Sequence, residues 1–567
     1  MQKNDKKIIF GWCMYDWANS AFATSITTAI LPAYFGALFL ASHGSAGWRG
    51  WSGESLWAFG VSFATAIVAL SSPPLGVIAD HLSLKMKFLK IYAFAGSLCT
   101  VLLFVAAWLP GYDWMWLLGL YMLANIGFAG GNVFYNSLLP SIVDEDQYDN
   151  ISSKGFAYGY IGGGLLLLIH LVVITASGNN PLIIRLSLAS VGIWWFGWGL
   201  LTFILVPEPN PTNTDNNFLS TSSTIKMAFG KLWETAQAIQ KFKVLFTYLL
   251  AFLLFNDGIQ TVLSVAGIYA AITLGVSLTF QMATILILQF VGAPGAIVFS
   301  KIAKNIGTKP ALFITLFIWA LVVLLAIGMS ALPPVAPTEH DYQLNGTEIK
   351  SEIRKETSYI VAKVPNLKNE RADADWQVKV GKWNKDDILT ISQAQLLREA
   401  TTQSRFSIHI TNGELAGSII GKDHPSQIGD GLIDFIPSTL RTYVWQPLRL
   451  SSSLQFLLLG IFVGFVMGGS QALSRSLFAT IMPETRSGEF FGFFGFIGKA
   501  ASVIGPLLFG FTARIFDRRV GILAILVIIL VGTLVLKFVD VNEGRRVAKE
   551  EDEQRRKEKI KTQVNTI

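Results

Sequence analysis

The chain has 567 residues, of which 52% are hydrophobic and only 15% are charged, and its mean hydropathy is +0.48. Soluble domains carry close to a quarter charged residues, so this composition excludes an ordinary soluble protein and predicts a polytopic membrane protein. The basic residues behind the formal net charge of +7 lie in short loops and a tail, which argues against a nucleic-acid partner. Cys13 and Cys99 are too few for a disulfide framework or a zinc site, and we expect no metal or other cofactor.

Apolar runs long enough to cross a bilayer recur along the whole chain. A bilayer core needs a helix of roughly 20 apolar residues. The first six runs cover residues 17–41, 55–79, 88–109, 114–138, 156–176 and 186–206. The next six cover residues 244–273, 277–300, 310–332, 453–481, 489–513 and 519–540. We therefore predict twelve transmembrane helices in two groups of six.

The predicted organisation follows from the polar stretches between these runs. The parts are an N-terminal six-helix half (1–206), a cytoplasmic linker (207–243), the first part of the C-terminal half (244–332), a soluble insertion (333–452), the last three helices (453–541) and a charged cytoplasmic tail (542–567). In the linker, apolar residues from Ile225 to Ile239 recur at helical spacing, which predicts an amphipathic helix against the bundle. The tail is expected to be a solvated, partly helical end.

The insertion is polar and almost charge-balanced, and on the predicted topology it lies outside the cytoplasm. Segments 359–364, 376–383 and 405–411 alternate between apolar and polar residues and predict strands, whereas 391–403 predicts a helix. A small α+β domain is therefore expected. We expect His409 to be a strand residue rather than a metal ligand.

Lysine and arginine in the short loops predict the orientation. The basic segments that an inside N-terminus places in the cytoplasm are the first seven residues, loops 81–90 and 301–309, the linker and the tail. The basic residues that this orientation places outside the cytoplasm are Arg49, Arg185 and the cluster Arg514, Arg518 and Arg519, and the cluster argues against the orientation. Both termini are thus expected in the cytoplasm, with a bacterial cytoplasmic membrane as the expected location and a vacuolar membrane as the alternative.

Three short matches indicate duplication. IADHLSLK after the second span matches IAKNIGTK after the eighth, and GYIGGG in the fifth span matches GFIGKA in the eleventh. Asp16 with Asn19 in the first span corresponds to Asp257 with Gln260 in the seventh. Parallel repeats of this kind build the major facilitator architecture. We predict an all-α membrane protein of this fold, with two pseudo-symmetric six-helix halves and an extracytoplasmic α+β insertion.

Five stretches carry a family resemblance. They are YDWANSAFATSITTAILPAYF, NVFYNSLLPSI, SSKGFAYGYIGGGLLLL, AFLLFNDGIQTVLSVAGIYA and GGSQALSRSLFATIMPETRSGEFFGFFGFIGKAASVIGPLLFG. Together they resemble the autophagy-related vacuole effluxer family, a branch of the major facilitator superfamily, over nearly all twelve spans but not over the insertion. The resemblance implies a twelve-helix transporter, with amino-acid export from the vacuole attributed to the eukaryotic members of the family.

The loop between the second and third spans resembles the signature of that superfamily, which is Gly, three residues, Asp, basic, any residue, Gly and two basic residues. Its matching residues are Gly76, Asp80, His81, Lys85 and Lys87, with Ser83 where the second glycine is expected. The resemblance implies that Asp80, Lys85 and Lys87 form a cytoplasmic gate through charge pairing and a neighbouring helix terminus. The alternative is that Asp80 is a solvated turn residue.

Acids inside the spans are candidate transport residues, because alternating access needs a polar site near the bilayer midplane. Asp257 lies some fourteen residues past Lys243, roughly 20 Å along a helix, and is the candidate for proton coupling. The alternative for Asp257 is a structural pair with Lys499 or Arg475. Asp16 is expected at the cytoplasmic edge of its span as an inner-gate or topology residue, with Asn19 one turn further in and lining the path.

Polar side chains on other spans complete the predicted solute and proton pathway. They are Asn132, Tyr135 and Asn136 on the fourth span, Gln260 on the seventh, Gln471 and Arg475 on the tenth, and Lys499 on the eleventh. A zwitterion fits this set, with Arg475 on its carboxylate and Asp257 on its ammonium group. Alternatively, Arg475 reaches the cytoplasmic interface and fixes the topology.

These observations favour a secondary active transporter of a small polar solute, most simply amino acids or related metabolites, working as an effluxer or with protons as coupling ion. Membrane lipid is the other expected partner. The alternative is a non-transporting receptor or scaffold that presents the insertion to an unknown partner. A membrane enzyme is disfavoured, because the sequence has no paired-histidine metal motif, nucleophile elbow or phosphate-binding loop, and no catalytic residue is expected.

Overall fold

The computed structural model describes residues 2–44, 48–49, 51–109, 111–209, 230, 241–272, 274–330, 333–350, 355–365, 367, 371–424, 426–427, 434–502, 504–515 and 518–565. The chain forms two compact units. The bundle unit comprises residues 1–266, 279–324 and 457–567, and the sheet unit comprises residues 267–278 and 325–456. The amphipathic helix predicted in the linker lies outside the described residues.

The first half of the bundle unit is built from long helices. They are α1 (Lys6–Ala21), which continues through the π-helix η1 (Phe22–Ala29) into α2 (Leu31–His43), α3 (Gly53–Leu82), α4 (Lys85–Leu102) with η3 (Leu103–Trp108), α5 (Asp113–Ser137), the short α6 (Leu139–Ile142) and η4 (Glu145–Gln147), α7 (Tyr148–Ala176) and α8 (Pro181–Leu205). Asp5 caps the start of α1 by accepting the Lys7 N–H at 2.7 Å. Such side-chain caps satisfy the free N–H groups of a helix start.

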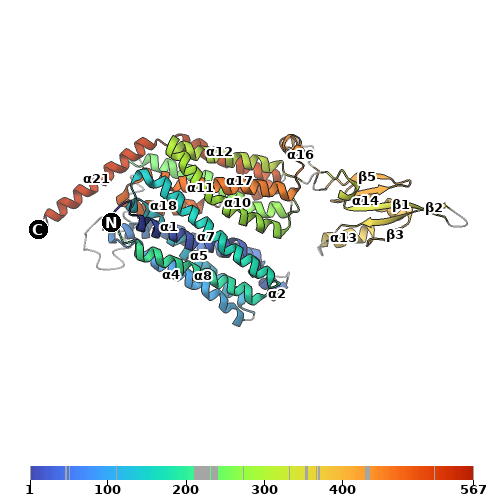
Figure 1. Ribbon diagram of the computed structural model, residues 1–567, viewed down its shortest axis with the longest axis horizontal. Coiled ribbons are helices and arrows are strands. Elements are labelled where there is room, and N and C mark those ends of the chain that lie inside the picture. The colour runs from blue at the N-terminus through green and yellow to red at the C-terminus, as the bar shows by residue number, and fades with distance from the viewer. Residues whose placement is uncertain are drawn as a thin grey trace. The chain divides into compact units, whose positions relative to one another are not determined.

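The second half repeats this arrangement and adds a charged helix. Its elements are α10 (Lys243–Ile272), α11 (Leu278–Ile306), α12 (Thr308–Ile327), α17 (Ser452–Ile481), η8 (Glu484–Arg486), α18 (Ser487–Ala500), α19 (Ile504–Ile515), α20 (Arg518–Lys537) and α21 (Val541–Asn565). In Figure 1 helices α1, α4, α5 and α8 gather in one group and α10, α11, α12 and α17 in another. The chain starts at the same end of the bundle at which α21 packs, and we call this end the terminal face.

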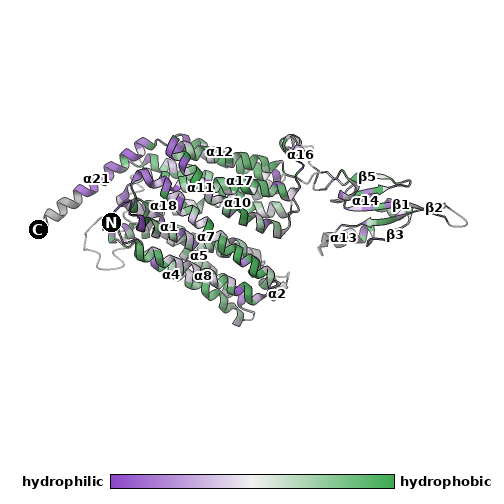
Figure 2. Ribbon diagram, viewed as in Figure 1, coloured by the Kyte–Doolittle hydropathy of each residue, from purple (hydrophilic) through white to green (hydrophobic). Residues whose placement is uncertain are grey.

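Length and hydropathy identify 11 helices of the described chain that can cross a membrane, and a twelfth if α20 counts together with α21, which is bent from it by 64°. Figure 2 shows the contrast between these apolar helices and the hydrophilic α21. The predicted fold class is confirmed. One boundary was wrong, because the first helix begins at Lys6 and not near residue 17. Asp16 therefore lies well inside its helix, since the apolar residues from Ile8 to Tyr15 extend the span ahead of it.

The two loops that the repeat matches each have a residue with positive φ at the equivalent position. Ser83 ends α3 with a φ of +53°, and Gly307, its counterpart between α11 and α12, has a φ of +93°. Left-handed backbone is cheap for glycine and strained for other residues. The serine at the glycine position of the loop signature therefore keeps the glycine conformation.

The sheet unit contains a five-stranded sheet in the order β3-β2-β1-β4-β5. Its elements are η6 (Pro337–Glu339), β1 (Tyr342–Lys350), β2 (Lys355–Lys363), α13 (Arg371–Val380), β3 (Ile388–Leu389), α14 (Ile391–Thr401), β4 (Ser407–Thr411), β5 (Gly417–Ile420), α15 (Phe435–Leu440), η7 (Arg441–Trp445) and α16 (Gln446–Leu448). Strand β1 pairs antiparallel with β2 and parallel with β4, and the other pairs are antiparallel.

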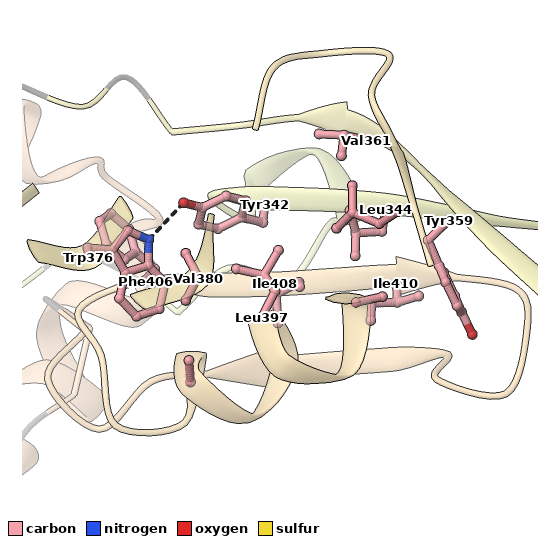
Figure 3. Close-up of a cluster of buried hydrophobic side chains, with 13 residues drawn as sticks. Tyr342, Leu344, Tyr359, Val361, Trp376, Val380, Leu397, Phe406, Ile408 and Ile410 are labelled. Carbon is pink, nitrogen blue, oxygen red and sulfur yellow. Dashed lines mark hydrogen bonds between the residues drawn. The ribbon is translucent and has the colours of Figure 1, made fainter. Parts of the chain in front are cut away.

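This sheet has its own hydrophobic core, drawn in Figure 3. Trp376 donates its indole N–H to the Tyr342 hydroxyl at 2.8 Å inside it. The strand predicted at 376–383 was wrong, because its first half belongs to α13. Trp376 and Val380 are buried one helical turn apart, while Val378 between them is 87% exposed. In so short a segment, the alternation of apolar and polar residues that predicts a strand also fits this helical spacing. His409 lies in β4, so its predicted place in a strand is confirmed, as is the helix α14.

Candidate functional site

Arg475 of α17 lies where the two halves of the bundle meet, and its side chain is only 3% exposed. Its Nε donates to the Ser152 hydroxyl at 2.9 Å, one terminal nitrogen donates to the Ser152 carbonyl at 2.7 Å, and the other donates to the Asn136 amide oxygen at 3.0 Å. The second terminal nitrogen also lies 3.5 Å from a carboxylate oxygen of Asp16. Every nitrogen of the guanidinium is thus engaged by the other half of the protein.

Aromatic rings enclose this guanidinium. Its central carbon lies 4.2 Å from the ring centre of Phe156, 4.8 Å from that of Trp12 and 5.6 Å from that of Tyr135. Cation–π contacts of this kind strengthen when water is excluded. The Tyr135 hydroxyl donates to Asp16 at 2.7 Å, which fixes the carboxylate against the arginine. We call Asp16, Tyr135, Asn136, Ser152 and Arg475 the central tie.

A glycine permits the close approach in the central tie. A Cβ added at Gly155 of α7 would lie 2.6 Å from an Asp16 carboxylate oxygen and 2.9 Å from the Trp12 ring. Real Cβ atoms do not come so close, so any side chain at 155 would push α1 away from α7. The glycine-rich sequence of α7 therefore positions Asp16.

A second polar layer lies deeper in the bundle. Asn19 donates to Asn132 at 2.7 Å within the first half. Tyr160 of α7 donates to Gln471 of α17 at 2.8 Å across the two halves. The structure thus brings seven of the predicted pathway residues together in two adjacent layers: Asp16, Asn19, Asn132, Tyr135, Asn136, Gln471 and Arg475.

The remaining pathway residues lie within the second half. Asp257 is fully buried on α10, and a Cβ added at Gly505 of α19 would lie 2.8 Å from one of its carboxylate oxygens. Gln260 donates to Asn256 at 3.4 Å, and Asn256 donates to the Gly498 carbonyl at 3.5 Å, beside Lys499. Arg475 pairs with Asp16. Its contacts therefore do not support the alternative in which Arg475 pairs with Asp257.

Asp80 joins the halves at the terminal face. Its carboxylate lies 2.8 Å from the Lys85 ammonium and accepts the N–H groups of Gly488 and Glu489 at 2.9 and 2.8 Å. These N–H groups belong to the first turn of α18, where a negative charge is favoured. Lys85 also donates to the Ser487 hydroxyl at 2.7 Å. Asp80 is only 7% exposed, so it is not a solvated turn residue and the alternative interpretation is wrong.

Lys87 has a different place from the other two predicted gate residues. Its side chain is exposed, and its backbone N–H is donated to Glu208 at 3.2 Å. Glu208 also accepts the Met86 N–H at 2.9 Å and so caps the start of α4. Burial raises the pKa of Glu208, although the backbone N–H groups work in the opposite direction.

A second clasp mirrors the first. Asp149 at the start of α7 accepts the Thr308 hydroxyl of the α11–α12 loop at 2.7 Å and also accepts the Ser476 hydroxyl. The first clasp joins loop α3–α4 to the start of α18, and the second joins loop α11–α12 to the start of α7. The duplication thus appears as two equivalent clasps, of which the sequence pointed only to the first.

Helix α21 spans both halves at the terminal face. Asp552 accepts the N–H groups of Glu484 and Thr485, each at 2.9 Å, in the second half. Arg545 and Lys549 pair with Glu145 in the first half. The tail predicted to be a solvated, partly helical end is a mostly exposed helix that also braces the bundle.

Several of these residues carried no recognisable signal in the sequence. Tyr160, Ser152 and Asn256 are single polar side chains in apolar helices, and such residues usually serve helix packing. Asp149 belongs to the acidic segment "DEDQYDN", which is typical of a solvated loop. The repeat could have identified it, because it opens the span equivalent to α18.

Comparison with known proteins identifies the family of this chain. The family model described as "Vacuole effluxer Atg22 like" matches residues 4–336 and 431–549, which leaves out most of the insertion. YxiO of Bacillus subtilis, described as an uncharacterized MFS-type transporter, is 24% identical over 561 residues that cover 98% of this chain and 99% of that protein. Autophagy-related protein 22 of Kluyveromyces lactis is 20% identical over 525 residues, 88% of this chain and 82% of its own length.

Solved structures support the fold. The human organic anion transporter MFSD10 superposes with a TM-score of 0.55 at 10% identity, over 94% of this chain and 100% of that chain. The proton:xylose symporter XylE superposes with a TM-score of 0.52 at 14% identity, over 94% of each chain. Likeness at this identity shows the major facilitator fold alone.

Proposed function

The chain belongs to the family of Atg22-like vacuole effluxers, membrane transporters of the major facilitator superfamily, and we propose that it moves amino acids or related metabolites by alternating access. In this proposal the terminal face lies in the cytoplasm and the host membrane is a bacterial cytoplasmic membrane. Protons are the proposed coupling ion. The family and the fold point to a transporter and not to an enzyme.

The observation that carries the proposal is the depth of the contacts between the halves. The two clasps, the α21 brace, the central tie and the Tyr160–Gln471 bond run inward from the terminal face. Tyr160 lies about 18 Å into α7, counted from Tyr148 at 1.5 Å per residue. This conformation is therefore closed on the terminal side, and with a cytoplasmic terminal face it is a state of the alternating-access cycle in which solute cannot reach the cytoplasm.

The same contacts assign roles to the predicted residues. The saturated guanidinium of Arg475 supports a structural tie in this state rather than a free carboxylate ligand. Opening the terminal face separates Asp16 from Arg475, so a proton on Asp16 would remove the charge pair that opposes opening. Asp257, deep in α10 and away from this tie, is the proposed second proton site.

The test uses purified protein in liposomes with a mixture of radiolabelled amino acids inside and an imposed pH gradient. We expect Asp257→Asn to weaken the pH dependence of efflux and to leave the part that comes from Asp16, because an amide cannot exchange a proton. Asp113→Asn, which changes an acid outside the pathway, is the matched control and should behave like the wild type. Efflux by Asp257→Asn with an unaltered pH profile would remove Asp257 from the mechanism, and no movement of any amino acid by the wild type would refute the substrate class.

The receptor alternative rests on the sheet unit, which has its own core and whose residues 337–430 the family model leaves out. Deleting residues 333–452 separates the two functions. Transport that survives the deletion favours a transporter with an accessory domain. A protein that moves no solute with or without the domain favours the receptor.

A further inference from the structure

Lys499 lies on the face of α18 that is turned toward the first half. On this helix, a Cβ added at Gly488 would meet Gly76, one at Gly492 would meet Pro73, and one at Gly495 would lie 2.9 Å from Val133. These glycines follow one another at spacings of four and three residues, which is one stripe of a helix. Lys499, four residues after Gly495, continues that stripe, about 18 Å into the helix counted from Ser487.

Among the described residues, none provides a counter-ion for the ammonium group of Lys499. Within the described ranges, no hydrogen bond and no ion pair reaches its Nζ, whereas Lys85, Arg475 and Arg486 are each paired with an acid. A charge at this depth of a membrane protein normally faces a partner or a water-filled path. Lys499 is only partly buried, so the described residues do not enclose it completely.

Amide groups extend the polar surface beside Lys499. The Gly498 carbonyl accepts the Asn256 amide, and Asn256 accepts the Gln260 amide. Gln260 thereby uses one N–H and leaves its carbonyl oxygen without a hydrogen bond among the described residues. A cation on α18 and an amide oxygen on the neighbouring α10 are suited to a solute with an anionic group and a donor group.

We propose that Lys499 is the binding residue for a carboxylate of the transported solute, and that the solute is a small organic anion or zwitterion. This inference rests on the proposed transport function and names the residue that recognises the carboxylate of its substrate. Lysine suits the task because its compact charge is not tied to one bidentate geometry. Arg475, the other central cation, is already occupied in this state.

The test measures ligand-induced shifts of the unfolding temperature for pairs of compounds that differ only in the carboxylate: L-alanine and L-alaninamide, L-lactate and lactamide, L-leucine and L-leucinamide. We expect carboxylates and not their amides to stabilise the wild type. Lys499→Gln should weaken that binding at least tenfold, and Lys499→Arg should retain part of it. Lys304→Gln, which removes an exposed lysine of the terminal face, is the matched control.

Lys499→Gln should also fold with an unchanged or higher unfolding temperature without solute, because it removes an uncompensated charge. Equal stabilisation by acids and amides, no stabilisation of the wild type by any of these carboxylates, or full binding by Lys499→Gln would overturn the proposal. Carboxylate binding that depends on Lys499 without transport in liposomes would instead refute the transport function and leave the binding site standing.

Discussion

The contacts of Asp80 predict how strongly a single substitution, Asp80→Asn, shifts the terminal face from closed to open. Asp80→Asn keeps the size of the side chain but removes the charge, one of the two acceptors for the N–H groups of Gly488 and Glu489, and the pair with Lys85. Hydrogen bonds to charged groups contribute about 1.5–3 kcal/mol each. We expect the closed state to lose about 3 kcal/mol, which shifts the equilibrium toward an open terminal face about 100-fold.

The distance between spin labels on exposed Lys87 and Lys304, one in each half, measures this shift. The labels are attached to cysteines introduced at these positions after Cys13 and Cys99 are replaced by serine. Asp80→Asn should convert a single short distance into a broad distribution with a longer component. Asp146→Asn removes an exposed acid of the same face and should leave the distance unaltered. A folded Asp80→Asn protein with the wild-type distribution would refute the view that the clasp holds the face closed.

Two further predictions concern the same face. Ser83→Gly should raise the unfolding temperature in detergent by roughly a degree or two, because it relieves about 1 kcal/mol of left-handed strain at a φ of +53°. The reverse change Gly307→Ser should lower the unfolding temperature. A decrease for Ser83→Gly would show that the Ser83 hydroxyl contributes more to stability than the relief of backbone strain. Asp552→Asn should loosen α21 from Thr485 and so lengthen the distance between the spin labels at positions 87 and 304. Glu553→Gln changes an exposed residue of the same helix and should leave that distance unaltered. Equal distances in the two variants would show that α21 does not brace the bundle.

The fold could be predicted because the bilayer imposes a simple rule on the sequence. Helices that cross it need long apolar runs, and these runs reveal both the spans and the duplication. The prediction failed where a short segment satisfied two rules at once. Trp376 and Val380 fit a strand by alternation and a helix by spacing, and only the sheet they pack on decides between these.

The candidate site was predicted in its residue types but not in its pairing. Asp16 and Arg475 were both singled out, yet no local pattern joins residues on α1 and α17. The partners of Arg475 lie more than three hundred positions away in the sequence, so they become neighbours only after both halves have folded. Likewise, the charges of α21 are typical of a solvated tail until Glu145 and Glu484 are placed beneath them.

The central tie explains which step of the cycle is expected to need a ligand or a proton. Asn136 and Arg475 are 339 residues apart, the separation that also relates Ser137 to Ser476 and Glu145 to Glu484, so at this bond each half meets its own counterpart. Duplication alone would pair like with like, but here one half supplies the cation. Its partner Asp16 is buried, and leaving such a pair broken costs about 3–5 kcal/mol.

A solute can shift the equilibrium only by its different affinity for the two states. Among the described residues, no hydrogen bond or ion pair joins Lys499 to the Asp16–Arg475 pair, so a solute held by Lys499 does not by itself replace that pair. Protonation of Asp16 offsets the loss of the pair, because it removes the negative charge before the halves separate. We infer that opening of the terminal face is controlled at Asp16, while Lys499 selects what is carried.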